Sequence, residues 1–346
     1  MKPIRAALLS FGMSGKVFHA PFLHLLPAFQ LAGAWERSRK EIATRYPGAT
    51  SFDTLDQLLA DDSIELVVVN TPNYTHYEYT KRALEAGKHV VVEKPFVTTV
   101  AEGEELCRIA GERGLLLSVY HNRRWDSDLL SVKEVIGSGA LGEIVEAALH
   151  FDRFKAELSP KLHKEKPGPG AGVLYDLGSH LIDSALHLFG TPYSVFADIR
   201  CLRPGSEVDD YFELLLYYPR LRVRLHASYF VREAPPSFQL YGTAGSFLKP
   251  RGDVQEARLQ AGEIPGEGWG AEDPATAGLL HSEHDDSAGR RTVAAPPGDY
   301  RAYFNGVAAA IRNGAPAPVT CSEGLQVIRV IETAFRSAAE GRVLPF

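Results

Sequence analysis

The sequence predicts an α/β fold in which a doubly wound parallel sheet is followed by an α+β domain with a large open, mainly antiparallel sheet. In the first third of the chain, short apolar runs such as His89–Glu93 alternate with helical segments, as in parallel sheets buried on both faces. Beyond residue 121, longer segments such as Leu221–His226 alternate apolar and polar residues, as strands with one exposed face do. We therefore expect two domains, at residues 1–121 and 122–346.

The composition is that of an ordinary folded protein. Of the 346 residues, 45% are hydrophobic and 23% are charged, and the formal net charge is -6. This charge gives no reason to expect binding to nucleic acid or to an acidic membrane surface. No apolar stretch approaches the roughly 18–20 residues of a membrane span, and the three scattered cysteines suit a reducing compartment. We expect a cytoplasmic protein with no membrane partner.

The first domain is expected to consist of repeated strand–helix units. Apolar runs predict strands at Ile4–Leu9, Leu31–Trp35, Thr50–Phe52, Glu65–Val69, His89–Glu93 and Leu115–Tyr120. Helices are expected near Gly15–Leu26, Lys40–Tyr46, Leu55–Leu59, Tyr74–Ala86 and Val100–Arg113. Right-handed crossovers bring the carboxyl ends of such strands to one edge of the sheet, where ligands bind.

The turn after the first strand has the spacing of a nucleotide-binding turn. It reads Ser10-Phe11-Gly12-Met13-Ser14-Gly15, so Ser10 departs from the first glycine of G-x-G-x-x-G. Gly12 lets a backbone approach a pyrophosphate, Gly15 permits close packing of helix on strand, and the helix N-terminus favours phosphate. The position of the turn predicts a Rossmann dinucleotide site that includes Met13 and Ser14. The alternative is an ordinary strand–helix turn that needs glycines.

The end of the second strand bears on the choice between NAD and NADP. Glu36 lies about 20 residues beyond the glycine turn, where an acid binds the adenosine ribose and favours NAD. Arg37, Ser38 and Arg39 follow it, and guanidinium groups suit the 2′-phosphate of NADP. Both cofactors remain open, with NADP slightly preferred.

Two further strand ends offer polar groups at the same edge. After the fourth strand, Thr71, Pro72, Asn73 and His76 are candidates to line the nicotinamide ribose, and Asn73 also suits the N-cap of a helix. After the fifth strand comes Glu93-Lys94-Pro95, where the proline ends the strand. The Lys94 ammonium is thereby placed to donate a hydrogen bond to a substrate oxygen, although a surface lysine in a turn is the plain alternative.

The second domain is expected to contain longer strands between fewer helices. Strands are expected at Ile144–Phe154, Val195–Leu202, Tyr211–Tyr218, Arg222–Val231, Phe238–Tyr241 and Ser246–Leu248. Helices are expected from Asp126 to Ile136, over Val173–Gly190, and at Asp299–Arg312 and Ser322–Glu340. Residues 252–298 read mostly as loop because they are rich in Gly, Pro and charge. An open sheet of this kind suits a homodimer or homotetramer interface.

The helix expected over Val173–Gly190 carries three ionisable groups in an almost entirely apolar segment. Asp176 and His180 are four residues apart and Asp183 lies three further on, so all three share one stripe. Asp176 is suited to orient His180 and stabilise its charged form, which leaves the other ring nitrogen for a substrate proton. A buried Asp–His pair that only ties the helix to its neighbours is the structural alternative.

Taken together, the glycine turn, the Thr71-Pro72-Asn73 turn, Glu93-Lys94-Pro95 and Asp176-x-x-x-His180 resemble the glucose–fructose oxidoreductase/inositol dehydrogenase (Gfo/Idh/MocA) family. The resemblance implies that Lys94 is catalytic with a usually cis peptide to Pro95, and that His180 is the general base. Leu117–Asp126 and Leu174–His180 are similar to the subgroup of NADP-dependent scyllo-inositol dehydrogenases. Glu93, Asn122 and Trp125 are further expected cofactor contacts.

The expected activity is NAD(P)-dependent hydride transfer from a polyol or sugar hydroxyl, without a metal. Substrate-binding residues are expected to be Lys94, Arg123, Tyr175, Asp176 and His180. Two other functions use the same fold: a regulator that senses the dinucleotide without catalysis, and a sugar-active enzyme with tightly held NAD. Arg123 and Arg124 suit either an acidic substrate or ion pairs within the protein, and Tyr175, Tyr300 and Tyr303 suit either hydrogen bonding to a polyol or packing. The segment His281–Asp286 has residue types that bind metals, but a solvated loop is preferred there.

Overall fold

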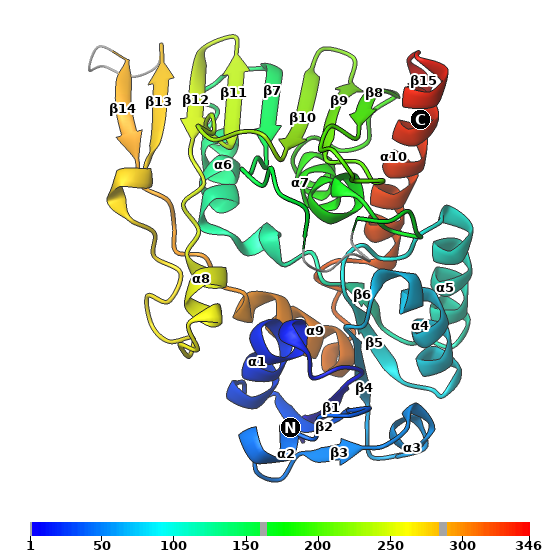
Figure 1. Ribbon diagram of the computed structural model, residues 1–346. Helices are drawn as coiled ribbons and strands as arrows, with labels where there is room; N and C mark the ends of the chain where they lie inside the picture. Colours follow the sequence, from blue (N-terminus) through cyan, green and yellow to red (C-terminus); the bar gives the residue numbers. More distant parts are fainter. Residues whose placement is uncertain (1, 160–164, 284–288) are drawn as a thin grey trace. The chain divides into compact units, whose positions relative to one another are not determined.

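The computed structural model describes residues 2–159, 165–283 and 289–346 (Figure 1). The chain divides into two compact units. The first contains residues 1–122, 255–267 and 299–325, and the second contains residues 123–254, 268–298 and 326–346. Two late segments of the chain therefore fold with the N-terminal unit. Among the described residues, no helix combines the length and the apolar character needed to cross a membrane.

The first unit is built on a six-stranded sheet with the order β3-β2-β1-β4-β5-β6, and every strand pair in it is parallel. The strands are β1 (Ile4–Leu8), β2 (Phe29–Trp35), β3 (Thr50–Phe52), β4 (Leu66–Val69), β5 (His89–Val92) and β6 (Leu117–Val119). All four residues of β4 are buried, as expected for a strand covered on both faces. The order reverses between β1 and β4, and this switch point is where open α/β sheets bind ligands.

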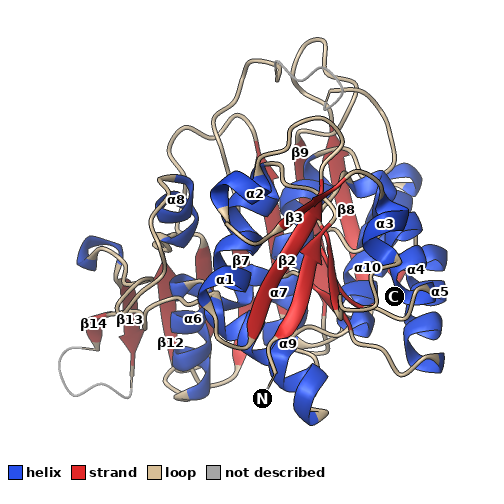
Figure 2. Ribbon diagram, turned by 90° about the horizontal axis from the view of Figure 1, so that it is seen from below, coloured by secondary structure: helices blue, strands red, loops and turns tan. Residues whose placement is uncertain are grey.

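Helices lie on both faces of this sheet (Figure 2). The helices of the first unit are η1 (Gly15–His19), α1 (Ala20–Leu25), α2 (Ile42–Arg45), α3 (Leu55–Leu59), η2 (Asn73–Thr75), α4 (His76–Glu85), α5 (Val100–Glu112), α8 (Gln255–Gln260) and α9 (Arg301–Asn313). Helices α3 and α5 begin with complete capping boxes, Thr54 with Gln57 and Thr99 with Glu102. Asn73 is the first residue of the 3-10 turn η2 rather than the residue before a helix, so its N-cap position was predicted wrongly.

The second unit is built on a nine-stranded sheet with the order β14-β13-β12-β11-β7-β10-β9-β8-β15 (Figure 1). Its strands are β7 (Ile144–His150), β8 (Ser194–Arg200), β9 (Tyr211–Tyr217), β10 (Arg222–Ser228), β11 (Phe238–Gly242), β12 (Gly245–Lys249), β13 (Gly278–Ser282), β14 (Arg290–Val293) and β15 (Leu344–Pro345). All pairs are antiparallel except β7 with β10, so the sheet is mixed but mainly antiparallel as predicted.

One face of this sheet is covered by helices. The remaining helices are η3 (Asn122–Trp125), α6 (Ser127–Gly137), η5 (Leu174–Gly178), α7 (Ser179–Phe189), η6 (Pro274–Thr276) and α10 (Cys321–Glu340). Helix α7 contacts β7 and β10, and α6 contacts β12. In β10 the alternate residues Val223, Leu225 and Ala227 are buried, while Arg224 on the other face is exposed.

The structure refines three sequence predictions. Most of the described residues in 252–298 are loop, as predicted, but the range also contains α8, η6, β13 and β14, which were not predicted. β7 ends at His150 and β10 at Ser228, earlier than Phe154 and Val231, although isolated pairing continues between Phe154 and Phe230. The helices expected from Gly15 and Val173 both begin with a five-residue π-helical turn, which a helical apolar pattern does not distinguish from an α-helix.

Candidate functional site

The turn between β1 and η1 is held by the end of β4. The Ser10 amide donates to Asn70 Oδ1 at 3.0 Å, and Asn70 Nδ2 donates to the Ser10 carbonyl at 2.8 Å. The Gly12 amide donates to Ser10 Oγ at 3.2 Å, so the serine that replaces the first glycine stabilises the turn itself. A Cβ on Gly15 would lie 2.3 Å from the Ser10 carbonyl oxygen, so the close packing of helix on strand requires glycine there.

A largely buried carboxylate, with 15% of its side-chain surface exposed, lies beneath this turn. Ser14 Oγ donates to Glu93 Oε1 at 2.5 Å, and His19 Nε2 lies 2.9 Å from the same oxygen. Burial alone would raise the pKa of Glu93, but the hydrogen bonds from His19 and Ser14 outweigh it and lower the pKa to about 2. Glu93 is therefore ionised at neutral pH, and it ties the end of β5 to the start of η1.

A cavity of about 420 Å³ opens beside the turn. It is lined by residues after three strands, namely Leu9–Gly12, Trp35–Arg39, Thr71, Pro72, Tyr74, Thr75 and Tyr79. The backbone around Gly12 and the first turn of η1 can hold a pyrophosphate there, as the sequence predicted. Ligand size also fits, because cavities that bind drug-sized molecules measure about 300–1,000 Å³.

The two candidate ribose-binding groups differ in their surroundings. Glu36 is buried, and its carboxylate accepts hydrogen bonds from the backbone amides of Glu41 at 2.9 Å and Ile42 at 3.3 Å. It therefore caps the start of α2. Arg37 and Ser38 are exposed at the cavity.

The segment after β5 is fixed by a histidine from α4. The Lys94–Pro95 peptide is cis, as the family resemblance implied. The fully buried His76 places Nδ1 2.8 Å from the Pro95 carbonyl and Nε2 2.9 Å from the Thr71 carbonyl. Burial lowers the pKa of His76. His76 therefore lies between the turn after β4 and the turn that carries Lys94, and in its neutral form it donates a hydrogen bond to one of these two carbonyl groups.

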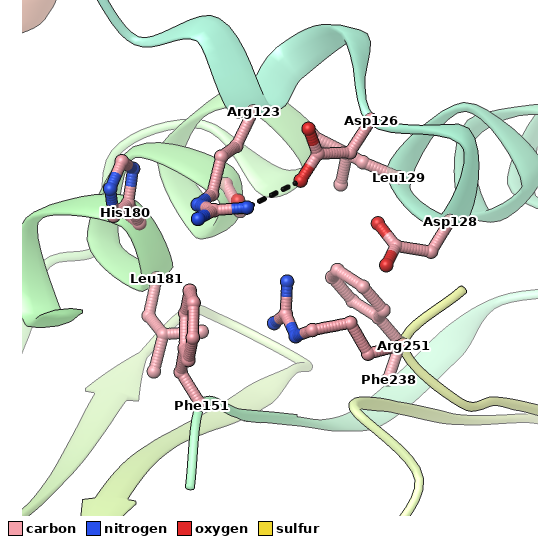
Figure 3. A pocket seen from close by; sticks show the side chains of 10 residues that line it. Arg123, Asp126, Asp128, Leu129, Phe151, His180, Leu181, Phe238 and Arg251 are labelled. Atoms are coloured by element: carbon pink, nitrogen blue, oxygen red, sulfur yellow. Dashed lines mark hydrogen bonds and ion pairs between the residues drawn. The ribbon is translucent and has the colours of Figure 1, made fainter. Parts of the chain in front are cut away.

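In the second unit, His180 lines a shallow pocket (Figure 3). The other lining residues are Arg123, Asp126, Asp128, Leu129, Phe151, Leu181, Ser184, Phe238 and Arg251. Arg123 donates to Asp126 at 3.0 Å. The guanidinium carbons of Arg123 and Arg251 lie 5.0 and 3.9 Å from the centre of the Phe151 ring. The pocket thus presents an imidazole and cations beside an aromatic ring.

The helix that carries Asp176 and His180 is held at its start by Asp209. The Leu174 amide donates to Asp209 Oδ2 at 2.7 Å, and a Cβ on Gly172 would lie 1.8 Å from Asp209 Oδ1. Burial is the main reason that the pKa of Asp209 rises to about 6. Asp176 lies in η5 and the buried His180 follows in the first turn of α7.

Several residues left open by the sequence have a defined place within the described chain. Arg124 pairs with Asp183 through two hydrogen bonds of 2.9 and 2.7 Å, both side chains being buried. Tyr175 stacks on Phe335 with 5.9 Å between ring centres, and Tyr303 Oη lies 2.9 Å from Ser118 Oγ. The Tyr300 side chain is buried. Asn122, which is also buried, and Trp125 both lie in η3, and Met13 is exposed in the glycine turn. His281 and Ser282 lie in β13, whereas residues 284–286 of the predicted charged loop lie outside the described residues.

Three structural supports of the site were not predicted: His19, Asn70 and Asp209. Asn70 had a usable signal, because it is the first polar residue after a fully buried strand at the ligand edge. No local sequence pattern indicated the roles of His19 and Asp209, because their hydrogen-bond partners lie 74 and 35 residues away in the sequence.

Comparison with known proteins covers nearly all of the chain. Residues 4–121 match the model described as "Oxidoreductase family, NAD-binding Rossmann fold", and residues 133–346 match "Oxidoreductase family, C-terminal alpha/beta domain" of the same family. The NADP-dependent scyllo-inositol 2-dehydrogenase IolW of Bacillus subtilis is 41% identical, covering 99% of this chain and 95% of that protein.

Other relatives are more distant or less specifically named. D-glucoside 3-dehydrogenase of Escherichia coli is 29% identical over 55% of each chain. The solved structure of YvaA from Bacillus subtilis superposes with a TM-score of 0.95 at 40% identity, covering 100% of this chain and 99% of the other.

Proposed function

Because the chain belongs to the Gfo/Idh/MocA family of oxidoreductases, we propose that it is an NAD(P)-dependent dehydrogenase acting on a CH–OH group of a polyol or sugar. The observation that supports this most is the placement of Lys94. It follows β5, and the adjacent strand β4 ends in the Thr71 turn that lines the nucleotide cavity. His76 fixes the backbone on both sides of this arrangement. A lysine at that edge is in the right place to bind the oxygen of a substrate whose hydrogen leaves toward the cofactor.

In the proposed mechanism, the proton and the hydride of the CH–OH group leave by different routes. A bound nicotinamide supplies the hydride acceptor. His180 takes the hydroxyl proton, and Lys94 donates a hydrogen bond to the same oxygen while charge develops on it. Asp176 orients His180 and stabilises its protonated form. The proposal requires the two units to present Lys94 and His180 to one hydroxyl group.

We assign NADP as the preferred cofactor. Both carboxylate oxygens of Glu36 already accept backbone hydrogen bonds from the start of α2. Arg37 and Ser38 are exposed at the cavity and have donors suited to a 2′-phosphate. The relative IolW is named for the use of NADP.

The names of the relatives support a polyol or sugar as the proposed substrate class. IolW is named for scyllo-inositol, and the more distant D-glucoside 3-dehydrogenase for a sugar derivative. An inositol therefore stands first among the candidates, with Arg123, Tyr175 and Asp176 as proposed substrate contacts beside Lys94 and His180. The open face of the second sheet is the proposed surface for a homodimer or homotetramer.

The test is a matrix of purified protein, NAD or NADP, and a panel of inositols and aldoses, followed by the absorbance of reduced nicotinamide. We expect reduction with at least one polyol, and faster reduction with NADP than with NAD. Saturable dinucleotide binding without any reduction would instead favour a dinucleotide sensor. Copurified cofactor that is never released would favour a sugar-active enzyme with tightly held NAD.

A further inference from the structure

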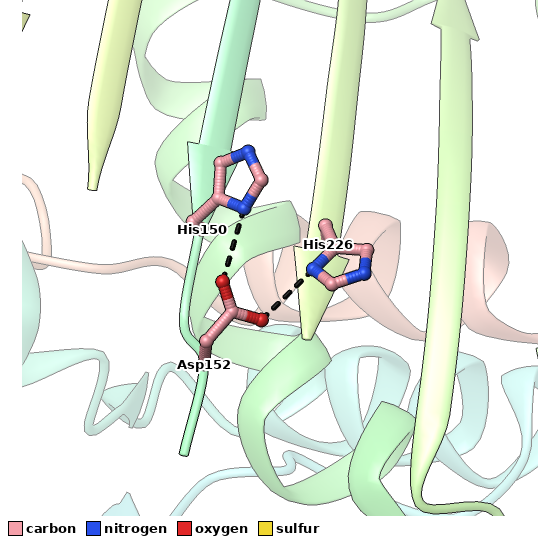
Figure 4. Close-up of side chains that lie close together, drawn as sticks. All are labelled: His150, Asp152 and His226. Carbon is pink, nitrogen blue, oxygen red and sulfur yellow. Dashed lines mark hydrogen bonds and ion pairs between the residues drawn. The ribbon is translucent and has the colours of Figure 1, made fainter. Parts of the chain in front are cut away.

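A second group of ionisable side chains lies outside both pockets. His150 ends β7, Asp152 follows two residues later, and His226 lies in the neighbouring strand β10 directly opposite His150 (Figure 4). Within the described residues, this is the group of three or more His, Cys, Asp and Glu side chains whose ligand atoms approach closely enough to hold a metal ion. Those atoms lie within 4.8 Å of one another.

The three side chains converge on the carboxylate. His150 Nδ1 lies 3.1 Å from Asp152 Oδ2, and His226 Nδ1 lies 2.8 Å from Asp152 Oδ1. The Ser228 amide also donates to Oδ1, at 3.1 Å, which fixes the carboxylate. Burial alone would raise the pKa of Asp152, but the hydrogen bonds with His150 and His226 lower it to about 2, so the carboxylate is charged at neutral pH.

The group faces away from the substrate pocket. In β10, His226 lies on the face opposite the buried Leu225 and Ala227. His150 pairs with it across the sheet, whereas the next residue, Phe151, lines the pocket of His180. Each imidazole keeps about 17% of its side-chain surface exposed in the single chain, on the open face of the sheet that is also the proposed oligomer surface.

The two nitrogen–oxygen spacings suit a metal ion with octahedral geometry, and the ligand atoms of the group all lie within 4.8 Å of one another. Metal–ligand bonds of about 2.1 Å at right angles place neighbouring ligand atoms about 3.0 Å apart. The two nitrogen–oxygen distances in this group are 3.1 and 2.8 Å. Two imidazoles and one carboxylate form the ligand set of facial metal sites that keep open positions for water.

We propose that His150, Asp152 and His226 form a binding site for a divalent first-row transition-metal ion, separate from the dehydrogenase site. The ion is coordinated by the two Nδ1 atoms and by the Asp152 carboxylate, with water in the remaining positions. The ring proton of each neutral histidine then lies on Nε2, so binding changes the tautomer of the ring without releasing a proton. The ion joins the end of β7 to β10, which are a parallel pair of strands in the described part of the second sheet.

The test uses the whole protein, stripped with chelator and desalted, and titrated with Co²⁺. The visible absorption of bound Co²⁺ reports coordination geometry, and calorimetry reports the stoichiometry. We expect one Co²⁺ per chain, with the weak absorption of an octahedral site, and displacement by Zn²⁺. We also expect the melting temperature to rise with metal concentration.

Matched variants locate the ion. His226→Gln and Asp152→Asn are expected to weaken Co²⁺ binding at least tenfold. His24→Gln, which removes an exposed histidine of the first unit, is expected to leave binding unchanged, as is His281→Gln in β13. Circular dichroism in chelator checks that each variant is folded.

Three results would overturn the proposal. They are the absence of stoichiometric binding, unchanged binding in both His226→Gln and Asp152→Asn, and loss of binding in His281→Gln. Dehydrogenase activity is not the readout, so failure of this site and failure of the proposed function are distinguishable.

Discussion

The two helices that carry the candidate site begin alike and are held differently. Both η1 and η5 are five-residue π-helical turns that pass directly into an α-helix. The start of η1 is glycine-rich, and its N-cap residue Ser14 makes no capping bond through its side chain within the described structure. At the start of η5, Asp209 accepts the Leu174 amide and so occupies the N-terminus with a carboxylate of the chain itself.

This difference bears on which helix start is suited to bind an anion. A helix N-terminus attracts negative charge through its amides and its dipole. At η5 the Asp209 carboxylate already accepts an amide, and the proposed chemistry there belongs to the side chains of Asp176 and His180. The start of η1 is the proposed phosphate site, and the nearby carboxylate of Glu93 holds the Ser14 and His19 side chains below the turn. Four predictions test this difference between the two helix starts.

The largest effect is expected from removing the proton-handling groups. Lys94→Met and His180→Ala should each lower kcat by about 10²–10⁴-fold, because general acid–base groups contribute that much. Dinucleotide binding should stay nearly intact, since the phosphate-binding turn is unchanged. Steady-state kinetics and calorimetric NADP binding measure the two quantities. His187→Ala in the same helix α7 is the control, and near-wild-type rates for both variants would refute the mechanism.

The next effect is expected at the backbone of η1. Gly15→Ala brings a methyl group against the Ser10 carbonyl oxygen, and backbone cannot move aside as a flexible side chain can. We expect NADP binding to weaken at least tenfold and the free energy of unfolding to fall by about 1–3 kcal/mol. Gly111→Ala is the matched control, because nothing lies within 4 Å of a Cβ at that helical position. Equal behaviour of both variants would show that the turn is not tightly packed.

A smaller, pH-dependent effect is expected from Glu93→Gln. The folded-state pKa of Glu93 lies below its ordinary value, so the carboxylate contributes stability above about pH 4.5 and loses it as pH falls toward 2. The difference of about 2.5 units corresponds to at most about 3 kcal/mol at neutral pH. Urea unfolding at several pH values measures it. Glu112→Gln, at an exposed pair with Arg108, should show almost no change.

The smallest effect, with the opposite sign, is expected from Asp209→Asn. The raised pKa of Asp209 means that ionisation of this carboxyl destabilises the folded protein. The free energy of unfolding is therefore greatest below about pH 4 and falls as the pH rises through about 6. Relative to Asp209→Asn, the wild type should therefore become less stable over that interval, by no more than about 3 kcal/mol. Asp273→Asn removes the same kind of carboxylate cap from the exposed helix η6 and serves as the control. A difference that does not vary with pH would contradict the role assigned to Asp209.

Much of the fold follows from local sequence. The run His89–Val92 predicts a strand buried on both faces. Leu55–Leu59 was predicted with its observed bounds, and in the structure Thr54 and Gln57 form a capping box at its start. β13 and β14 were missed because they are short and lie among glycine, proline and charged residues. β13 pairs with β12 on one side and with β14, the next strand in the sequence, on the other.

The site is predictable where its chemistry depends on residue type and not where it depends on long-range contacts. The cavity lining confirms that the turns after β1, β2 and β4 gather at one edge of the parallel sheet. The contacts of Glu93 with Ser14 and His19 join residues 79 and 74 positions apart, so no local pattern reveals them. The dual contact of His76 with two carbonyl groups was likewise invisible in the sequence.

The most direct test of the central claim is direct transfer of hydrogen from the substrate carbon to the nicotinamide. The protein is incubated with NADP and an inositol deuterated at every carbon, and the reduced dinucleotide is analysed by mass spectrometry and NMR. The account predicts reduced dinucleotide with one deuterium at C4 of the nicotinamide, and loss of this product in Lys94→Met and His180→Ala. Saturable NADP binding with no deuterated product from any polyol or sugar tested would contradict it.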